Sequence, residues 1–295
     1  MKIGVLTKTV GFVNAQTGTD SRSNYICPED IIRMLNPLDE VALEYALALK
    51  DRSAGVKVVA VSVGDRFAEE GLRRALAMGV DDAIHIQCEE LGQLDAMATS
   101  ALLARACERE SFDLILCGDT SIDDNDGLEG PYLAGRLAIP HISRAVKVSV
   151  GGNRQVLEIE RVVERGDRQL MQCSLPALLT VQKGSTVPRY PTLAGFLHAE
   201  SSHVRVLTPA DLEFAKNDTL FSLNTTRIAA RSNPKPKKQR GVAERSRLSA
   251  AERIDLMVSR DATKGKEGGT IIDGLSEEMF TRLDDILEEA GILKR

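Results

Sequence analysis

Short apolar runs alternate with longer amphipathic stretches through the first half of the chain, and this alternation limits the fold more than any other feature. The apolar runs cover residues 2–6, 56–63, 83–86 and 114–117. In the stretches between them, residues 37–49, 67–78 and 94–110, apolar side chains recur every three or four positions, as in helices with one buried face. Strands alternating with helices on short connections predict an α/β fold with an open, mainly parallel sheet flanked by helices.

The residue types at the ends of these stretches support the predicted boundaries. Asn36 and Pro37 have the residue types of an N-cap and a first helical position, and Gly79 has that of a left-handed C-cap. Residues 11–30 are mostly polar and contain glycine and proline, which predicts a long excursion or a hairpin between the first strand and the first helix.

The pattern changes after about residue 145. Residues 146–150, 156–163 and 170–173 alternate with period two, which predicts a β-hairpin insertion. The continuously apolar residues 175–181 predict a return to the main sheet. Residues 183–197 contain glycine, prolines and few core candidates, so we expect a projecting loop there.

The end of the chain has a different composition. Residues 229–247 are rich in Lys and Arg, and residues 276–290 have the pattern of a final helix. We therefore expect an α/β domain of the nucleotide-binding type over residues 1–225 and a C-terminal extension over residues 226–295. Two interpretations fit the basic segment. It binds an acidic partner or nucleic acid, or it is a solvated tail.

Residues 113–140 have the order of a ligand site in an open α/β sheet. An apolar strand ends at Gly118, a polar loop follows, and a helix-forming pattern begins near Gly130. Glycines in this loop allow backbone N–H groups to approach a bound group closely. The loop also holds five carboxylates, which repel phosphate. A nucleotide site and a solvated acidic loop both fit this stretch.

Composition and motifs exclude several classes of function. The formal net charge of −5 gives no basic field for nucleic acid, and the absence of Trp argues against a base-stacking surface. The five cysteines have no Cys-x-x-Cys spacing, so we expect reduced, packed thiols in a cytoplasmic protein and no metal site. No apolar stretch is long enough to span a bilayer, and the N-terminus predicts a strand rather than a signal peptide.

Chemical machinery is also missing from the sequence. It has no Gly-x-Ser-x-Gly elbow, no HExxH and no P-loop, and the Asp-rich run at residues 123–127 does not fit the frame of a calcium loop. The four histidines are scattered. We expect no catalytic residue, and a chain without its own acid, base or nucleophile fits a carrier or subunit better than a complete enzyme.

Five stretches together resemble the β subunit of electron-transfer flavoproteins. They lie in register within about residues 1–200, together with the Lys8-Thr9-Val10 start, and read Leu-Asn-Pro-Leu-Asp-Glu-Val-Ala at 35–42, Ala-Leu-Ala-Met-Gly-Val-Asp at 75–81, Ile-Asp-Asp at 122–124, Ile-Glu-Arg at 159–161 leading to Leu-Pro-Ala-Leu-Leu-Thr at 175–180, and Pro-Arg-Tyr-Pro-Thr-Leu at 188–193.

The resemblance implies an adenine-nucleotide α-hydrolase-like fold and a heterodimer with an α subunit, toward which residues 226–295 would extend. FAD would be held mainly by that partner, with this chain packed beside it. Electrons would arrive from a flavin dehydrogenase such as an acyl-CoA dehydrogenase and leave for a quinone oxidoreductase. The β subunit would hold AMP, or a second FAD in electron-bifurcating members.

The resemblance also implies site residues, position by position. The cofactor pocket would comprise Leu6, Asn36, Pro37, Leu38, Asp39, Val63, Gly118, Asp119, Thr120, Ser121, Ile122, Asp123, Asp124, Asn125, Asp126, Gly127, Leu128 and Glu129. A docking loop at about residues 183–199 would offer Tyr190, Thr192, Leu193 and Phe196 to a dehydrogenase, with Leu193 as the apolar anchor.

The chain departs from the family pattern at the proposed nucleotide site. AMP-type members carry Asn-Gln-Thr-Gly where residues 127–130 read Gly-Leu-Glu-Gly. This change removes side-chain contacts to phosphate and adds the charge of Glu129. The Gly130-Pro131 pair resembles the bifurcating type, whose Thr-Ala-Gln is absent, and Leu38 stands where some members have an aromatic residue near the flavin.

Three functions are therefore consistent with the sequence. The first is a non-catalytic electron-carrier subunit. The second is a bifurcating subunit that binds its own FAD and uses NADH. The third is a stand-alone adenine-nucleotide-binding module with a regulatory role.

Overall fold

The computed structural model describes residues 1–13, 31–89, 92, 94–151, 155–214, 220–226 and 281. The chain divides into two compact units, residues 1–233 and 234–295. All the elements described below belong to the first unit. The expected C-terminal extension, including its helix at 276–290, lies almost entirely outside the described residues.

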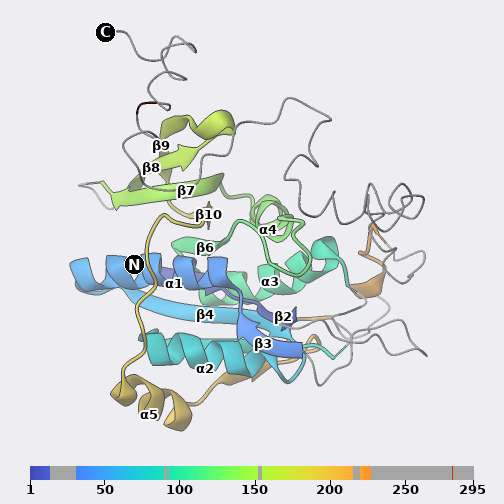
Figure 1. Ribbon diagram of the computed structural model, residues 1–295. Coiled ribbons are helices and arrows are strands. Elements are labelled where there is room, and N and C mark those ends of the chain that lie inside the picture. Colours follow the sequence, from blue (N-terminus) through green and yellow to red (C-terminus); the bar gives the residue numbers. More distant parts are fainter. Residues whose placement is uncertain are drawn as a thin grey trace, which may run out of the picture. The chain divides into compact units, whose positions relative to one another are not determined.

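A nine-stranded sheet forms the centre of the first unit, in the order β11-β5-β4-β1-β6-β10-β7-β8-β9 (Figure 1). The strands from β11 to β7 are parallel, and β8 and β9 add an antiparallel pair at one edge. The register places Val5 of β1 beside Ala60 of β4 and Leu116 of β6. The predicted open, mainly parallel sheet is confirmed.

The strands are β1 (Lys2–Leu6), β2 (Thr9–Val13), β3 (Ile31–Leu35), β4 (Lys57–Gly64), β5 (Asp82–Gln87), β6 (Leu114–Gly118), β7 (His141–Val150), β8 (Val156–Val162), β9 (Arg168–Ser174), β10 (Ala177–Val181) and β11 (Arg205–Leu207). The helices are α1 (Pro37–Arg52), α2 (Ala68–Met78), α3 (Ala96–Glu110), α4 (Glu129–Leu137) and α5 (Leu193–Ser201), with a 3-10 turn at Glu164–Gly166. The alternation predicted for the first half matches these bounds closely.

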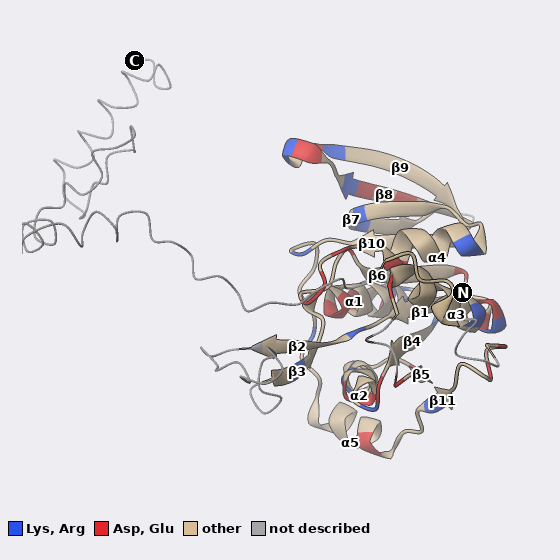
Figure 2. Cartoon of the chain, turned by 90° about the vertical axis from the view of Figure 1, so that its right-hand side faces the viewer, with Lys and Arg blue, Asp and Glu red and all other residues tan. Residues whose placement is uncertain are grey.

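Helices cover both faces of the sheet, which is why its central strands are almost wholly apolar. Figure 2 shows α1 and α2 on one side of the strands and α3 and α4 on the other. The first core cluster joins α1 and α2 to β1, β4 and β6 through residues such as Ile3, Leu43 and Leu72. The second joins α3 and α4 to the opposite face through Val61, Leu102 and Leu133.

Helix ends follow the predicted residue types with one exception. Pro37 begins α1, and Gly79 ends α2 with φ +116°, a left-handed cap that suits glycine. Asn36 occupies the N-cap position, but its side chain makes no capping hydrogen bond. Its amide instead donates to the carbonyl of Thr120, 3.0 Å away. The capping role expected for the Asn36 side chain is therefore wrong.

The hairpin interpretation of residues 11–30 is supported where the chain is described. β2 and β3 pair antiparallel, with Phe12 opposite Ile32, and residues 14–30 lie outside the described residues. The second hairpin region extends the main sheet: β7 pairs with β10, and β8 and β9 follow it. β10 lies between β6 and β7, which confirms the predicted return to the sheet.

The prediction of a projecting loop at residues 183–197 is wrong in its second part. α5 begins at Leu193, and Thr192 caps it by accepting a hydrogen bond from the Gly195 N–H at 3.0 Å. This helix packs against α2, and Ala199 is buried in the contact. Because only Ala199 is buried in α5, the helix has no apolar stripe facing the core that a search by spacing would find.

The last described segment of the first unit is tied to the start of α3. The Asp95 carboxylate caps α3 through the Ala98 N–H and also accepts hydrogen bonds from the backbone and hydroxyl groups of Thr225 and Thr226. Burial raises the pKa of Asp95, but the backbone donors at Ala98, Thr226 and Thr225 outweigh it and hold this pKa well below its usual range. In the described part of the chain no helix has the length and apolarity to cross a membrane.

Candidate functional site

The topology of the sheet reverses between β1 and β6, and this switch point, with the residues around it, is called the crevice. β1 and β6 are neighbours, yet the chain leaves β1 toward α1 on one face and leaves β6 toward α4 on the other face. In open α/β sheets, such a reversal is the usual position of a bound ligand, at the carboxyl ends of the strands. Residues 7–8 and 36–39 border it on one side, and residues 118–129 border it on the other.

Asp39 joins the two sides of this crevice. Its carboxylate accepts hydrogen bonds from the backbone N–H of Lys8 at 2.8 Å and of Gly118 at 2.9 Å. A side chain at Gly118 would come within 2.6 Å of the Asp39 carboxylate and 2.7 Å of the Leu38 Cβ, so only glycine allows this approach. Burial raises the pKa of Asp39 to about 7, although the two N–H donors oppose the shift.

The acidic loop is folded around Lys8. The Lys8 ammonium lies 3.0 Å from the Asp123 carboxylate and 2.5 Å from that of Asp124. Burial lowers the pKa of Lys8, but hydrogen bonds and charges of Asp124 and Asp123 outweigh this effect and raise it. Lys8 therefore pairs with two of the five carboxylates of the loop but offsets the charge of only one, and Arg144 lies 4.0 Å from a third, Asp119.

Two further contacts fix the ends of the loop. The Asn36 amide donates to Thr120, while its Oδ1 is buried with no hydrogen-bond partner among the described residues. The Thr180 hydroxyl of β10 donates to Asp119 at 2.7 Å and accepts the backbone N–H of Arg144 at 3.0 Å. Asn36 thus leaves a buried acceptor that a ligand's N–H or O–H group would satisfy.

The first turn of α4 closes the loop. A helix N-terminus attracts anions through backbone N–H groups that have no partner within the helix. In α4 only Glu129 and Gly130 can supply such groups, because Pro131 has no N–H and the Tyr132 N–H donates to the Leu128 carbonyl at 3.1 Å. Glu129 is the first residue of this helix, however, and burial together with the nearby Asp126 raises the pKa of the Glu129 carboxyl group. Gly127 adopts φ +64°, a left-handed conformation that glycine takes without strain.

These groups fit one part of a nucleotide better than the other. Leu6 and Val63 are buried at the ends of β1 and β4 and supply apolar surface, and Asn36 supplies an acceptor. For phosphate, the loop offers backbone donors, while Lys8 is already paired and Glu129 is acidic. The residues of this crevice therefore offer apolar surface and a side-chain acceptor, while Lys8 is already paired; that they hold a nucleotide stays a prediction.

The predicted pocket residues lie at the same edge of the sheet. Leu6, Asn36–Asp39, Val63 and the loop from Gly118 to Glu129 all flank the β1–β6 crevice or the end of the adjacent strand β4. Within the loop, Ile122 and Leu128 are exposed. Lys8 and Thr180 were not predicted as site residues. Lys8 had a readable signal, because it is a cation two residues after a central strand in a protein whose ligand loop is acidic.

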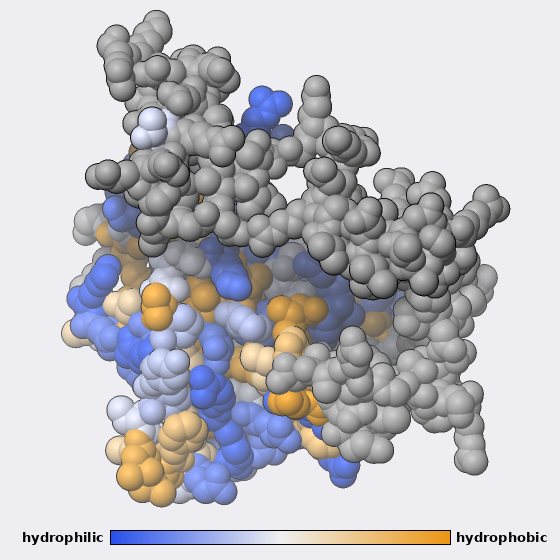
Figure 3. Space-filling view, viewed as in Figure 1, coloured by the Kyte–Doolittle hydropathy of each residue, from blue (hydrophilic) through white to orange (hydrophobic). Residues whose placement is uncertain are grey.

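The predicted docking residues lie on and just before α5. Tyr190 is 89% exposed, Leu193 76% and Phe196 50%. Figure 3 shows apolar side chains gathered over α5, and the neighbouring Leu197 is also exposed. Thr192 differs from the other three, because its hydroxyl is engaged in capping the helix.

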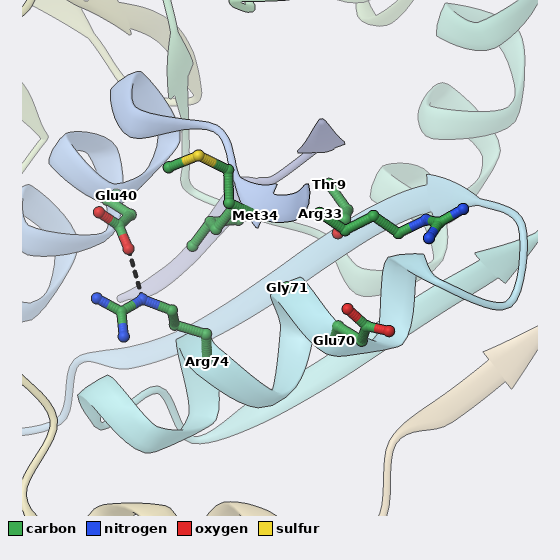
Figure 4. A pocket seen from close by; sticks show the side chains of 8 residues that line it. Thr9, Arg33, Met34, Glu40, Glu70, Gly71 and Arg74 are labelled. Atoms are coloured by element: carbon green, nitrogen blue, oxygen red, sulfur yellow. Dashed lines mark hydrogen bonds and ion pairs between the residues drawn. The ribbon is translucent and has the colours of Figure 1, made fainter. Parts of the chain in front are cut away.

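A second hollow lies between the β2–β3 hairpin and α2, away from the predicted residues (Figure 4). It has a volume of about 350 Å³, and Arg74 of α2 closes one end by an ion pair of 2.6 Å with Glu40. Arg33 lies over the ring of Phe67, 3.5 Å from its centre. The hollow is lined by two arginines and two glutamates. Their charges balance, so the hollow favours neither an anion nor a cation.

Metal and thiol chemistry find no site in the described residues. No group of three or more His, Cys, Asp or Glu side chains in this part of the chain has the arrangement of a metal site. Cys88, Cys107, Cys117 and Cys173 are buried. Cys27 lies outside the described residues.

Comparisons with known proteins match most of this unit. A family model described as electron transfer flavoprotein domain matches residues 29–212. The electron transfer flavoprotein subunit beta of Thermoanaerobacterium thermosaccharolyticum is 34% identical over 235 residues, which cover 79% of this chain and 88% of that protein. The subunit of the same name from Bacillus subtilis is 39% identical over 193 residues, covering 65% and 74%. The acryloyl-CoA reductase electron transfer subunit gamma of Anaerotignum propionicum is 34% identical over 196 residues, covering 65% and 71%.

Proposed function

The chain belongs to the electron transfer flavoprotein family as a β subunit, and from this premise we propose how it works. It pairs with an α subunit that holds most of the FAD. The heterodimer accepts electrons from a flavin dehydrogenase, such as an acyl-CoA dehydrogenase, and passes them to an acceptor such as a quinone oxidoreductase. This chain supplies no catalytic residue, and its site of action is cytoplasmic.

The crevice between β1 and β6 is the observation that carries the proposal. Asp39, Asn36 and the loop from Gly118 to Glu129 lie at the carboxyl edge of the sheet, which supports a nucleotide there because open α/β sheets usually bind ligands at this edge. FAD supplies the redox chemistry when it is bound. The protein contributes its placement and surroundings.

The nucleotide of the crevice is proposed to be AMP, with an adenosine group against Leu6 and Val63. Asn36 would accept a hydrogen bond from the base or sugar, and the backbone N–H groups of Glu129 and Gly130 at the start of α4 would meet the phosphate. Glu129 opposes the phosphate by its charge, and its raised pKa reduces that opposition as the pH falls.

The exposed side chains of Tyr190, Leu193 and Phe196 are proposed as the docking surface for the dehydrogenase. A small apolar patch on a rigid element suits a weak complex that exchanges rapidly. The similarity to a subunit named for acryloyl-CoA reductase supports a redox partner that acts on acyl-CoA substrates. A reductase receives electrons, so this name by itself favours an acyl-CoA partner on the acceptor side.

An alternative is a bifurcating subunit that holds a second FAD in the crevice and uses NADH. The Gly130-Pro131 pair and the absence of phosphate-binding side chains at residues 127–129 favour this alternative. A stand-alone adenine-nucleotide-binding module with a regulatory role is the remaining alternative. It requires only the crevice and no α partner.

One preparation separates these functions. The chain is co-expressed with its α subunit, and the purified complex is examined by its flavin spectrum and by mass spectrometry of the released nucleotides. One FAD and one AMP per heterodimer are expected. Two FAD molecules would favour the bifurcating subunit. A stable, colourless monomer that binds AMP without a partner would leave only the stand-alone module.

A further inference from the structure

The proposed docking surface is held to the rest of the domain at two points. After β10 the chain runs over α1 and then enters α5, which packs beside α2 (Figure 1). Tyr190 lies near the end of the crossing segment, and Leu193 begins the helix. The contacts on either side of these residues decide whether they form a fixed surface or a loose loop.

The first attachment is formed by Arg189, immediately before Tyr190. Its guanidinium group binds the Glu44 carboxylate of α1 through two hydrogen bonds of 2.9 Å, and its backbone N–H donates to the same carboxylate at 2.9 Å. Asp51 accepts a further bond of 2.8 Å. These hydrogen bonds to Glu44 and Asp51 raise the pKa of Arg189 despite partial burial. Such two-pronged pairing fixes both the position and the orientation of the guanidinium group.

The second attachment is formed by Arg73 of α2 at the far end of α5. Its guanidinium group donates to the carbonyl of Ala199 at 2.7 Å and to that of Glu200 at 3.3 Å. Carbonyls in the last turn of a helix lack partners within the helix, so an arginine placed there stabilises the helix end. Glu69, one turn earlier in α2, holds Arg73 in place by an ion pair of 2.6 Å.

Between these two attachments the helix lies directly on α2. Gly195 faces the backbone carbonyl of Ala77 so closely that a Cβ atom would collide with it. The N-terminal end of α5 is capped by Thr192. The exposed side chains of Tyr190, Leu193 and Phe196 therefore project from a segment whose backbone is fixed before, within and after them.

We propose that Glu44 and Arg73 are positioning residues for partner docking. They hold the segment from Tyr190 to Phe196 in the shape that the partner binds, although both belong to helices outside that segment. This inference rests on the proposed function, because it takes these exposed residues to be the docking surface for a dehydrogenase.

The reason is the cost of ordering a binding surface. A segment that is already fixed loses little conformational freedom when a partner binds, whereas a loose one must be ordered at each encounter. Loss of either attachment should therefore weaken the complex without changing the rate of electron transfer within it. The Michaelis constant should rise while the turnover number stays the same.

The test uses the flavin-loaded heterodimer as electron acceptor for an acyl-CoA dehydrogenase supplied with its acyl-CoA substrate. We compare the wild type with Glu44→Gln, Arg73→Leu and Leu193→Ala. For the first two we expect KM to rise about three- to tenfold with kcat unchanged, the factor for ordering one or two side chains. Hydrogen exchange of the amides at residues 190–196 should become faster in both variants.

Matched controls carry the same chemical changes on α3. Glu108→Gln and Arg105→Leu remove partners of an exposed ion pair on the opposite face of the sheet, and they should leave KM, kcat and amide exchange at the wild-type values. Arg189→Lys keeps the charge but loses the two-pronged geometry. Arg189→Lys should therefore raise KM, and it serves as the test if Glu44→Gln does not fold.

The outcomes distinguish the two proposals. If Leu193→Ala raises KM but Glu44→Gln, Arg189→Lys and Arg73→Leu do not, the positioning role is rejected and the docking surface stands. If Leu193→Ala has no effect, the docking surface itself is wrong and the positioning role falls with it. A decrease in kcat at constant KM in the attachment variants would also overturn the positioning role.

Discussion

At the scale of single residues, Asp39 has the most unusual environment. It is 5% exposed, and it connects Lys8, Gly118 and the start of α1 through two backbone N–H groups. Its pKa of about 7 lies above the value of 3.8 expected in the unfolded chain. Between these values the folded protein binds a proton that the unfolded protein does not, so this residue favours folding most at low pH.

The substitution Asp39→Asn tests whether the raised pKa of Asp39 affects stability. The stabilisation from proton binding at Asp39 is fully present below about pH 3.8 and is lost as the pH rises through about 7. The asparagine also loses one acceptor, which costs about 1–3 kcal/mol. We expect the wild type to exceed the variant in free energy of unfolding by more at pH 5 than at pH 8, as measured by urea denaturation. An advantage that grows with pH would contradict this interpretation.

The residue types indicated which residues could line the crevice, but not which of their side chains form ion pairs. Gly118, Asp39 and the acidic loop were predicted from the strand–loop–helix order and from the family resemblance, and they lie at one edge of the sheet. The ion pairs of Lys8 with Asp123 and Asp124 join residues more than 110 positions apart in sequence. Such contacts depend on which strands become neighbours, and this information is not contained in any local pattern.

At the scale of elements, two glycines on helices differ in what surrounds them. Gly71 of α2 lies under the β2–β3 hairpin, where a Cβ atom would come within 2.5 Å of the Thr9 hydroxyl and 3.3 Å of Leu35. Gly135 of α4 is exposed, with nothing within 4 Å of the same position. The same substitution should therefore have opposite effects.

Gly135→Ala should raise the free energy of unfolding by about 1 kcal/mol, because alanine favours a helix more than glycine does. Gly71→Ala has the same intrinsic gain, but the collision with the hairpin should produce a net loss of about 1–2 kcal/mol. Chemical denaturation of the two variants measures both values. Stabilisation by Gly71→Ala would show that the hairpin does not rest on α2 as described.

Element types were easier to predict than their roles. The first three helices were found because each has an apolar face directed at the sheet. α5 was taken for loop because its apolar side chains, including Leu193 and Phe196, point outward and only Ala199 is buried. A search for buried faces misses a helix that is anchored by a cap, a glycine contact and an arginine.

At the scale of the whole molecule, residues 1–233 form one compact unit with a core on each face of the sheet. We expect a fragment that ends at Asn233 to unfold in a single cooperative transition, at a temperature within a few degrees of that of the corresponding transition in the full chain. Calorimetry of both proteins provides the comparison. A fragment without a cooperative transition would mean that the second unit is required for the first to fold.

Sequence order predicted the class of fold but not the order of strands. The alternation of strands and helices requires a parallel sheet, and the sheet has one. The insertion of β10 between β6 and β7 was not readable, because β10 follows β9 in the chain and yet pairs with neither β8 nor β9.

The bonds of Asp95 to Thr225 and Thr226 have a consequence for how the described part of the first unit ends. They fix Thr225 and Thr226 at the beginning of α3, at the carboxyl edge of the sheet where β1 and β6 also end. Because protonation of this carboxylate requires unusually strong acid, the anchorage should survive conditions that release ordinary surface ion pairs. The described part of the first unit therefore ends at a point that acid does not readily release.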